Sequence, residues 1–255
     1  SLLGTKGLPV NPMCCGGPSE SWLGDPEFMS LAQWAFEAKR KGGLTIRPHF
    51  PWCGGTEHPV PIILGLLDAI ETAGLVGKDY PMQEWYRFLN CGYRVALVGG
   101  TDKMCAGSPV GWIRTYAKLD ANAEFSWNNW AKAVRAGRTI ATTGPLMDVM
   151  VDGKTMGDCI KMSAAGGTVE VSAWAKSCWP IGKLEIVYNG NIVAANYSRS
   201  GLKELHINER VKIPASGWIA ARAYGYEKHP ANYMAAHSSP IYVKCGNTRA
   251  FDGPA

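Results

Sequence analysis

The chain has 255 residues and 46% hydrophobic content, so it can bury one or two domain cores. Its net charge is +5, and no run of like charge is longer than Lys39-Arg40-Lys41, which argues against a nucleic-acid-binding face. No apolar window reaches the roughly 18 residues of a membrane-spanning helix, so no membrane partner is expected. Composition leaves the cellular compartment open.

Helices and short apolar runs alternate before residue 145. The predicted elements are, in chain order, a helix from Asp25-Pro26-Glu27 to Gly42-Gly43, a strand at 44–48, a short helix at 60–67, a strand at 68–71, a helix from Tyr80 to Cys91, a strand at 94–98, an extended piece at 112–117 and a helix capped by Ser126 and ended by Gly137. This alternation predicts an α/β unit whose strands pair mostly in parallel.

After residue 145 the hydrophobic pattern changes to a period of two, with apolar and polar residues alternating. The alternating segments are 147–153, 168–175, 184–193, 205–208 and 217–224. Asp152-Gly153 and Asn189-Gly190 are dipeptides typical of tight hairpin turns. These features predict an antiparallel β-sandwich and two domains, 1–145 and 146–255, divided near Gly144-Pro145.

Three strand ends in the first unit present side chains that can bind metal ions. Val95-Ala-Leu-Val-Gly-Gly-Thr-Asp102 runs apolar, breaks on two glycines and then presents a carboxylate. Leu44-Thr-Ile-Arg-Pro-His49 ends in an imidazole, and the strand at 68–71 ends in Glu71. Because the carboxyl ends of parallel strands meet at one edge, we expect these side chains at one mouth of the fold. The pattern favours a metallohydrolase barrel.

Longer motifs around these positions carry a family resemblance. Gly42-Gly-Leu-Thr-Ile-Arg-Pro-His49-Phe-Pro, Leu64-Gly-Leu-Leu-Asp-Ala-Ile-Glu71 and Val98-Gly-Gly-Thr-Asp102 resemble the PHP (polymerase and histidinol phosphatase) superfamily, in particular its carbaryl-hydrolase-like branch. The resemblance covers roughly residues 14–245. It implies a distorted β/α barrel that binds divalent metal ions (zinc, manganese or iron), with His49 and Asp102 as metal ligands.

Two positions depart from the family pattern. Position 104 is Met where the pattern has His, and a thioether is a poor ligand for the metal ions of hydrolases. No histidine precedes His49, so the opening His-x-His of the family's first barrel strand is missing from this sequence. We therefore expect a partial barrel, followed by the β-sandwich, with an incomplete site that binds metal weakly or not at all.

Other polar residues near the strand ends are candidates for catalysis or substrate binding. Arg114 and Lys103 are expected to stabilise charge on the substrate, and Glu71 is a third catalytic candidate. The alternative for each is an ion pair within the barrel. The candidates for substrate binding are Trp52, Glu57, His58 and His237. Glu57 and His58 could instead be a solvated loop pair, and His237 could lie in the domain junction.

The resemblance implies a metal-dependent hydrolase that acts on a phosphoester, a carbamate or an amide. Two alternatives stay open. One is a non-catalytic relative whose mouth binds a small anion or a sugar, and the other is an interaction module that uses the β-sandwich. The expected partners are a small-molecule substrate or ligand and, to cover the open sheet edge of a partial barrel, a second copy of the chain.

Overall fold

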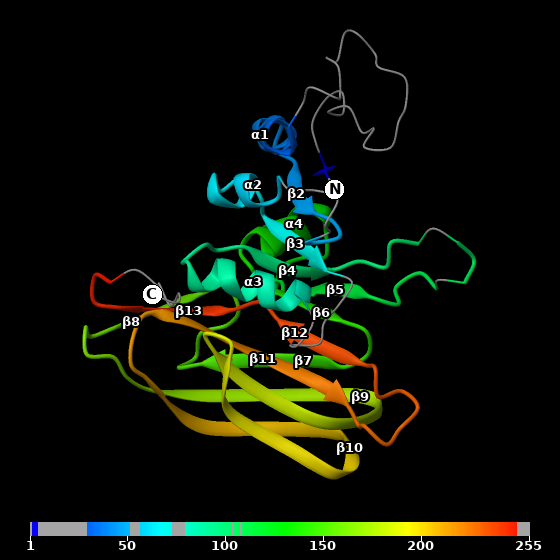
Figure 1. The fold of residues 1–255 in the computed structure, drawn as a ribbon, viewed down its shortest axis with the longest axis vertical. Helices are drawn as coiled ribbons and strands as arrows, with labels where there is room; N and C mark the ends of the chain where they lie inside the picture. The colour runs from blue at the N-terminus through cyan, green and yellow to red at the C-terminus, as the bar shows by residue number, and fades with distance from the viewer. Residues whose placement is uncertain are drawn as a thin grey trace.

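The structure is a computed structural model that describes residues 2–4, 30–51, 57–72, 80–103, 105–107 and 109–248. A small sheet with helices around it occupies one end of the molecule, and a large bent antiparallel sheet occupies the other (Figure 1). The described helices are α1 (Leu31–Arg40), α2 (Pro59–Ile63), α3 (Tyr80–Asn90) and α4 (Trp127–Arg135). None of these helices has the length and apolar character needed to cross a membrane.

The small sheet contains the parallel strands that the sequence predicts. Its order is β1 (Leu2–Leu3), β2 (Leu44–Arg47), β3 (Ala69–Thr72) and β4 (Ala96–Gly99). Strands β2, β3 and β4 pair in parallel, and β1 pairs antiparallel to β2. Ala69 and Val98 pack in a cluster with Val134 of α4, whereas Ile70 packs in the cluster that contains Trp85 of α3. Both faces of β3 are therefore covered, and all four of its residues are buried.

Side-chain caps fix two of the helix starts. Ser30 begins α1 with a capping box, because its Oγ accepts from the Gln33 N–H (3.2 Å) and its own N–H donates to Gln33 Oε1 (2.8 Å). The predicted start of this helix at Asp25-Pro26-Glu27 lies outside the described residues. Ser126 caps α4 as predicted, with its Oγ accepting from the Asn129 N–H at 3.2 Å.

The large sheet takes up the remaining strands. These are β5 (Arg114–Ala117), β6 (Thr139–Thr142), β7 (Leu146–Val151), β8 (Cys159–Met162), β9 (Gly167–Tyr188), β10 (Asn191–Ile213), β11 (Gly217–Gly225), β12 (Ala235–Ser238) and β13 (Ile241–Cys245). The main path is β10-β9-β11-β12-β6-β5, with β7 paired to β9 and β13 paired to β11 and β8. The β8–β13 pair is parallel, and the other pairs of this sheet are antiparallel.

Strands β9 and β10 form one long hairpin that belongs to two layers. Asn189 and Gly190 make its turn with positive φ, as predicted. Strand β7 pairs with residues 171–176 of β9, and β11 pairs with residues 181–188. The β9–β10 register shifts between these halves, around Pro180, which has no N–H to donate. The inner faces of both layers share one apolar core that includes Val149, Val171, Leu184 and Ile219. The predicted β-sandwich fits this arrangement.

The predicted α/β barrel is wrong. Strands β5 and β6 flank α4, yet they pair antiparallel, with Arg114 opposite Thr142. Strand β6 then pairs with β12, where Ala141 lies opposite His237, and so joins the large sheet instead of extending β2-β3-β4. The described fold is therefore mostly β. A strand–helix–strand pattern gives the order of the elements but not the direction in which the second strand pairs, and this is why the prediction failed. The division into 1–145 and 146–255 stays a prediction.

Hydroxyl groups from the large sheet cover the open edge of β4. The Leu97 N–H donates to Ser239 Oγ (2.9 Å), and Thr139 Oγ1 donates to the Leu97 carbonyl (2.8 Å). The Gly99 N–H donates to Thr115 Oγ1 (2.9 Å), which in turn donates to the Gly99 carbonyl (2.8 Å). The edge-facing backbone groups of Leu97 and Gly99 are thus satisfied without another strand. A homo-oligomer that covers a sheet edge stays a prediction.

Candidate functional site

A pocket of about 430 Å³ lies at the carboxyl ends of β2, β3 and β4. The residues that line it are Ile46, Pro48, His49, Glu71, Val98, Gly99, Gly100, Asp102, Thr115 and Trp130. Three of the predicted site residues, His49, Glu71 and Asp102, therefore share one pocket. The parallel pairing of β2, β3 and β4 explains this, because it brings the three strand ends to the same edge.

His49 and Asp102 face each other across the pocket. His49 Nε2 lies 3.4 Å from Asp102 Oδ2, and both side chains are partly exposed. The backbone φ angles of the two residues are also positive, 52° for His49 and 46° for Asp102. Such a conformation costs a non-glycine residue on the order of 1 kcal/mol. Residues with strained backbone conformations are enriched at functional sites, so the presence of two of them in one pocket makes it a candidate site.

Glu71 forms the buried side of the pocket and is only 8% exposed. Its Oε2 accepts the His49 N–H at 3.0 Å. Among the described residues, no group donates a hydrogen bond to Oε1. Burial raises the pKa of Glu71; the hydrogen bond from His49 opposes this shift, and the nearby charge of Asp102 adds to it. The carboxyl group is therefore suited to take up either a proton or a hydrogen-bond donor.

Gly99, the last residue of β4, and Gly100, which follows it, allow the chain to pass close to its neighbours. A Cβ on Gly100 would lie 3.1 Å from Cδ and Oε1 of Glu71. A Cβ on Gly99 would lie 2.7 Å from Ile113 Cγ2, closer than real contacts allow. The Gly-Gly pair therefore permits β4 to approach both Glu71 and the segment before β5.

The predicted metal centre is not supported. Within the described residues, no three or more His, Cys, Asp and Glu side chains are grouped so that they could hold a metal ion. One oxygen of Glu71 already accepts from the His49 backbone, and the His49 imidazole is directed at Asp102. Position 104 lies outside the described residues. The metal-binding interpretation is corrected accordingly, and the PHP and hydrolase interpretations lose the support that a metal centre would have given.

Arg114 and Lys103 do not line this pocket. Arg114 Nη1 donates to the Gly111 carbonyl at 2.8 Å. Lys103 Nζ donates to the Cys105 carbonyl at 2.8 Å, and its side chain is exposed. The catalytic roles that the sequence suggested for these two cations stay predictions.

Of the predicted substrate-binding residues in the 52–58 loop, the described ones, Glu57 and His58, do not line the pocket either. Glu57 Oε2 accepts the Leu31 N–H at 2.7 Å, at the start of α1. The His58 ring lies edge-on to the Phe50 ring, with 5.3 Å between centroids. Trp52 lies outside the described residues. Glu57 and His58 thus make contacts that hold α1 and α2 in place.

His237 is completely buried between α3 and the large sheet, so it does not reach a surface pocket. Its Nδ1 must donate to the Ser238 carbonyl (2.8 Å), so Nε2 accepts from the Tyr86 hydroxyl (2.5 Å). Burial lowers the pKa of His237 to about 3, which keeps the ring neutral. Arg222 donates to the Tyr86 oxygen (3.4 Å) and to Glu185 Oε2 (2.7 Å). These contacts place His237 between α3 and the large sheet, which agrees with the alternative that His237 lies in the domain junction and not in a substrate-binding site.

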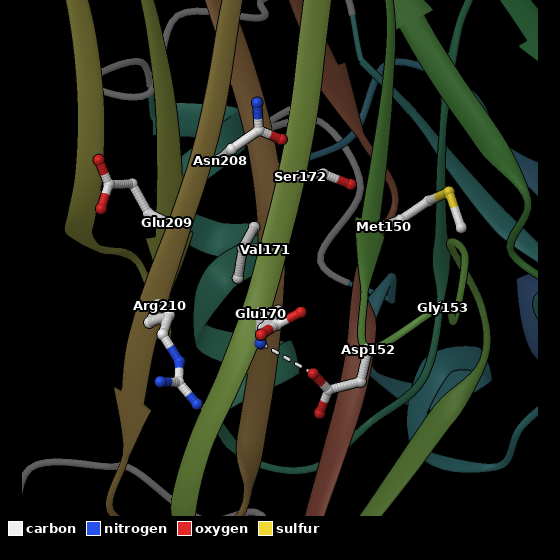
Figure 2. Close-up of a pocket in the computed structure, with 9 residues that line it drawn as sticks. All are labelled: Met150, Asp152, Gly153, Glu170, Val171, Ser172, Asn208, Glu209 and Arg210. Atoms are coloured by element: carbon white, nitrogen blue, oxygen red, sulfur yellow. Dashed lines mark hydrogen bonds between the residues drawn. The ribbon is translucent and has the colours of Figure 1, made fainter.

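A second hollow lies on the outer face of β7, β9 and β10 (Figure 2). The Asp152 carboxylate accepts the Glu170 N–H at 2.8 Å, the dashed line in Figure 2, and so serves the hairpin turn. Glu170 lies opposite Arg210 in the strand register, and the Glu209 side chain points away from the other labelled groups. These are the features of a solvated sheet face with opposite charges at facing positions of the register, and we assign it no function.

Comparison with known proteins identifies no family for this chain. No family model matches it, and no curated protein matches it. Among solved structures it is similar to the fibronectin(III)-like modules of Clostridium thermocellum CbhA, with 17% sequence identity and a TM-score of 0.25, over 39% of this chain and 99% of that chain.

Sequence reasoning missed two residues of the pocket. Trp130 has the helical spacing of a core residue, and it packs partly against the small-sheet cluster. Thr115 lies in a short extended segment, and the sequence gives no sign that β5 turns back toward the end of β4. Both residues reach the pocket through the antiparallel placement of β5 and the position of α4, which are non-local features.

Proposed function

We propose that the pocket at the carboxyl ends of β2, β3 and β4 binds a small polyhydroxylated molecule of the sugar type. The observation that carries this proposal is Glu71, a buried pocket carboxylate with one oxygen that accepts no hydrogen bond from the described residues. Leaving such a buried oxygen unpaired costs about 1–3 kcal/mol, which a ligand hydroxyl group that displaces the pocket wall enough to reach it would recover.

The other residues of the pocket favour a neutral ligand that donates hydrogen bonds. Asp102 offers a half-exposed carboxylate, and together with Glu71 it can accept from several hydroxyl groups. Trp130 adds an aromatic surface for the apolar face of a sugar ring. The volume of about 430 Å³ is in the range of small-molecule sites. A small anion, the other ligand that the sequence suggested, would be repelled by the two carboxylates.

Calorimetric titration with neutral monosaccharides and with glucuronate tests the proposal. Asp102→Asn should weaken sugar binding by roughly tenfold, since a hydrogen bond to a charged group is lost. Asp152→Asn is the matched control, because Asp152 also has positive φ (47°) but lines the outer-face hollow of Figure 2 and not this pocket. Binding of glucuronate in preference to neutral sugars, or equal loss in both variants, would count against the proposal.

A further inference from the structure

Away from this pocket, a cavity of about 560 Å³ lies where the end of α3 meets β11 and β13. The residues that line it include two cations, Arg94 and Lys244, and none of the described lining residues is an aspartate or a glutamate. Asn247 and Tyr242 are also among the lining residues. We propose that this cavity is a binding site for a phosphate group.

Arg94 is held in place without an acidic partner. Its guanidinium carbon lies 4.5 Å from the centroid of the Tyr242 ring, a cation–π arrangement that orients the planar group. Its Nη2 donates to Cys159 Sγ at 3.4 Å, a weak acceptor. No described carboxylate forms a salt bridge with Arg94, so most of its five N–H donors are available to a ligand.

Lys244 provides the second charge. It is exposed on β13, and the salt bridges of the described residues do not include it. Lys161 of β8 lies directly opposite Lys244 in the parallel β8–β13 register and adds a third cation nearby. A phosphate group carries a charge of about −1.5 to −2 near neutral pH, which matches two lining cations, and Arg94 can hold two of its oxygens at once.

The carboxyl end of α3 does not oppose an anion here. Helix C-termini carry partial negative charge on their last carbonyl groups. In this helix the carbonyls of Arg87, Phe88 and Leu89 accept hydrogen bonds from the N–H groups of residues 91–93, at 2.9–3.0 Å. These carbonyl groups are therefore satisfied by the chain itself, and the charge in the cavity is set by Arg94 and Lys244.

Calorimetry of the full chain with inorganic phosphate and with phenyl phosphate, at constant ionic strength set with chloride, tests the inference. Arg94→Gln and Lys244→Gln should each weaken binding by roughly tenfold or more. Arg94→Lys should lose part of the affinity, because the charge remains but the fork of donors does not. Lys203→Gln removes a charge from an exposed position on β10 and should leave binding unchanged.

The two phosphates separate the sources of the ligand. Saturable binding of inorganic phosphate, lost in the Arg94 and Lys244 variants, supports a site for the free ion. Binding of phenyl phosphate alone, with the same losses, supports a site for a phosphate ester. If neither binds saturably, or if the Arg94 and Lys244 variants behave like Lys203→Gln, the inference is overturned. Circular dichroism of each variant verifies that the fold is retained.

Discussion

At the scale of single residues, Glu71 connects the fold to the proposed function. It is the penultimate residue of β3, an interior strand of the small sheet, and its buried side chain lies beside Gly100, which follows β4. Burial raises its pKa, and one carboxylate oxygen accepts no hydrogen bond from the described residues. A residue of this kind costs stability in the free protein, which is typical of a position kept for binding.

The raised pKa of Glu71 predicts a pH dependence of stability. The pKa of this carboxyl group is higher in the folded protein than its ordinary value of 4.5, which applies in the unfolded chain. At pH values between the unfolded-state pKa and the folded-state pKa, the folded state therefore binds more protons than the unfolded state. Stability from this group is therefore highest below pH 4.5 and is lost as pH rises through the folded pKa. Glu71→Gln should remove this part of the dependence.

Urea unfolding of the wild type and Glu71→Gln from pH 4 to pH 8 would measure the effect. We expect the stability of the variant relative to the wild type to increase with pH across this range. The control is Glu209→Gln, which changes an exposed carboxylate on β10. Parallel pH profiles for wild type and Glu71→Gln would show that burial does not set the charge state of Glu71.

Tyr86 gives a second prediction at this scale. Its hydroxyl donates to buried His237 and accepts from Arg222. Tyr86→Phe leaves these groups short of a partner, so we expect a loss of about 1–3 kcal/mol in the free energy of unfolding. Tyr197→Phe is the matched control, because Tyr197 is 61% exposed and the change should be nearly neutral. Equal stability of the two variants would argue against the network.

At the scale of the elements, the edge of β4 is the feature that joins the two sheets. Its backbone groups are satisfied by side-chain hydroxyls of Thr115, Thr139 and Ser239 rather than by another strand. The same hydroxyls fix where β5, β6 and the segment after β12 lie against the small sheet. Thr115 also lines the pocket, so this edge positions part of the candidate site.

Thr139→Val tests the role of these hydroxyls. Valine keeps the shape and suits a strand, but the buried Leu97 carbonyl and the Ser239 hydroxyl each lose a partner. We expect a loss of about 1–3 kcal/mol, measured by chemical unfolding. Thr168→Val, at an exposed position of β9, should change stability by less than about 0.5 kcal/mol. An unchanged Thr139→Val protein would mean that the hydroxyl contacts contribute nothing.

Local signals predicted the parts of the fold that depend on nearby residues. The Ser126 cap, the Asn189-Gly190 turn and the ends of α3 depend on chemistry within a few positions, and the structure has them where expected. The antiparallel return of β5 and β6 depends instead on hydroxyl contacts more than 15 residues away, and the barrel prediction failed there.

The residues of the candidate site also divide into those that local sequence patterns predicted and those that non-local contacts bring to the pocket. His49, Glu71 and Asp102 lie at or just beyond the carboxyl ends of β2, β3 and β4, and this local rule was sufficient to predict that they share a pocket. Trp130 and Thr115 reach the pocket from elements whose placement the sequence does not encode locally. The continuity of β9 from Gly167 to Tyr188 was also missed. A proline between two alternating segments, such as Pro180, resembles a break between two separate short strands.

At the scale of the whole molecule, the hydrogen-bonded sheet runs across residue 145. Strand β6 pairs with β12, and the Tyr86–His237 contact ties α3 to the sandwich. We therefore expect thermal unfolding to be one cooperative transition, with coincident curves from far-ultraviolet circular dichroism and from tryptophan fluorescence. Two separated transitions would show that the segments before and after residue 145 unfold independently.

The central claim is that the end of the small sheet is a small-molecule site. Because His49 lines this pocket while His206 and His229 do not, the imidazole resonances of the chain report directly on where a ligand binds. In a nuclear magnetic resonance titration with a neutral monosaccharide, we predict saturable shifts of the His49 ring signals that require roughly tenfold more sugar in Asp102→Asn, with His206 and His229 unchanged. Unmoved His49 signals at saturating sugar, or equal shifts of all three histidines, would contradict the account.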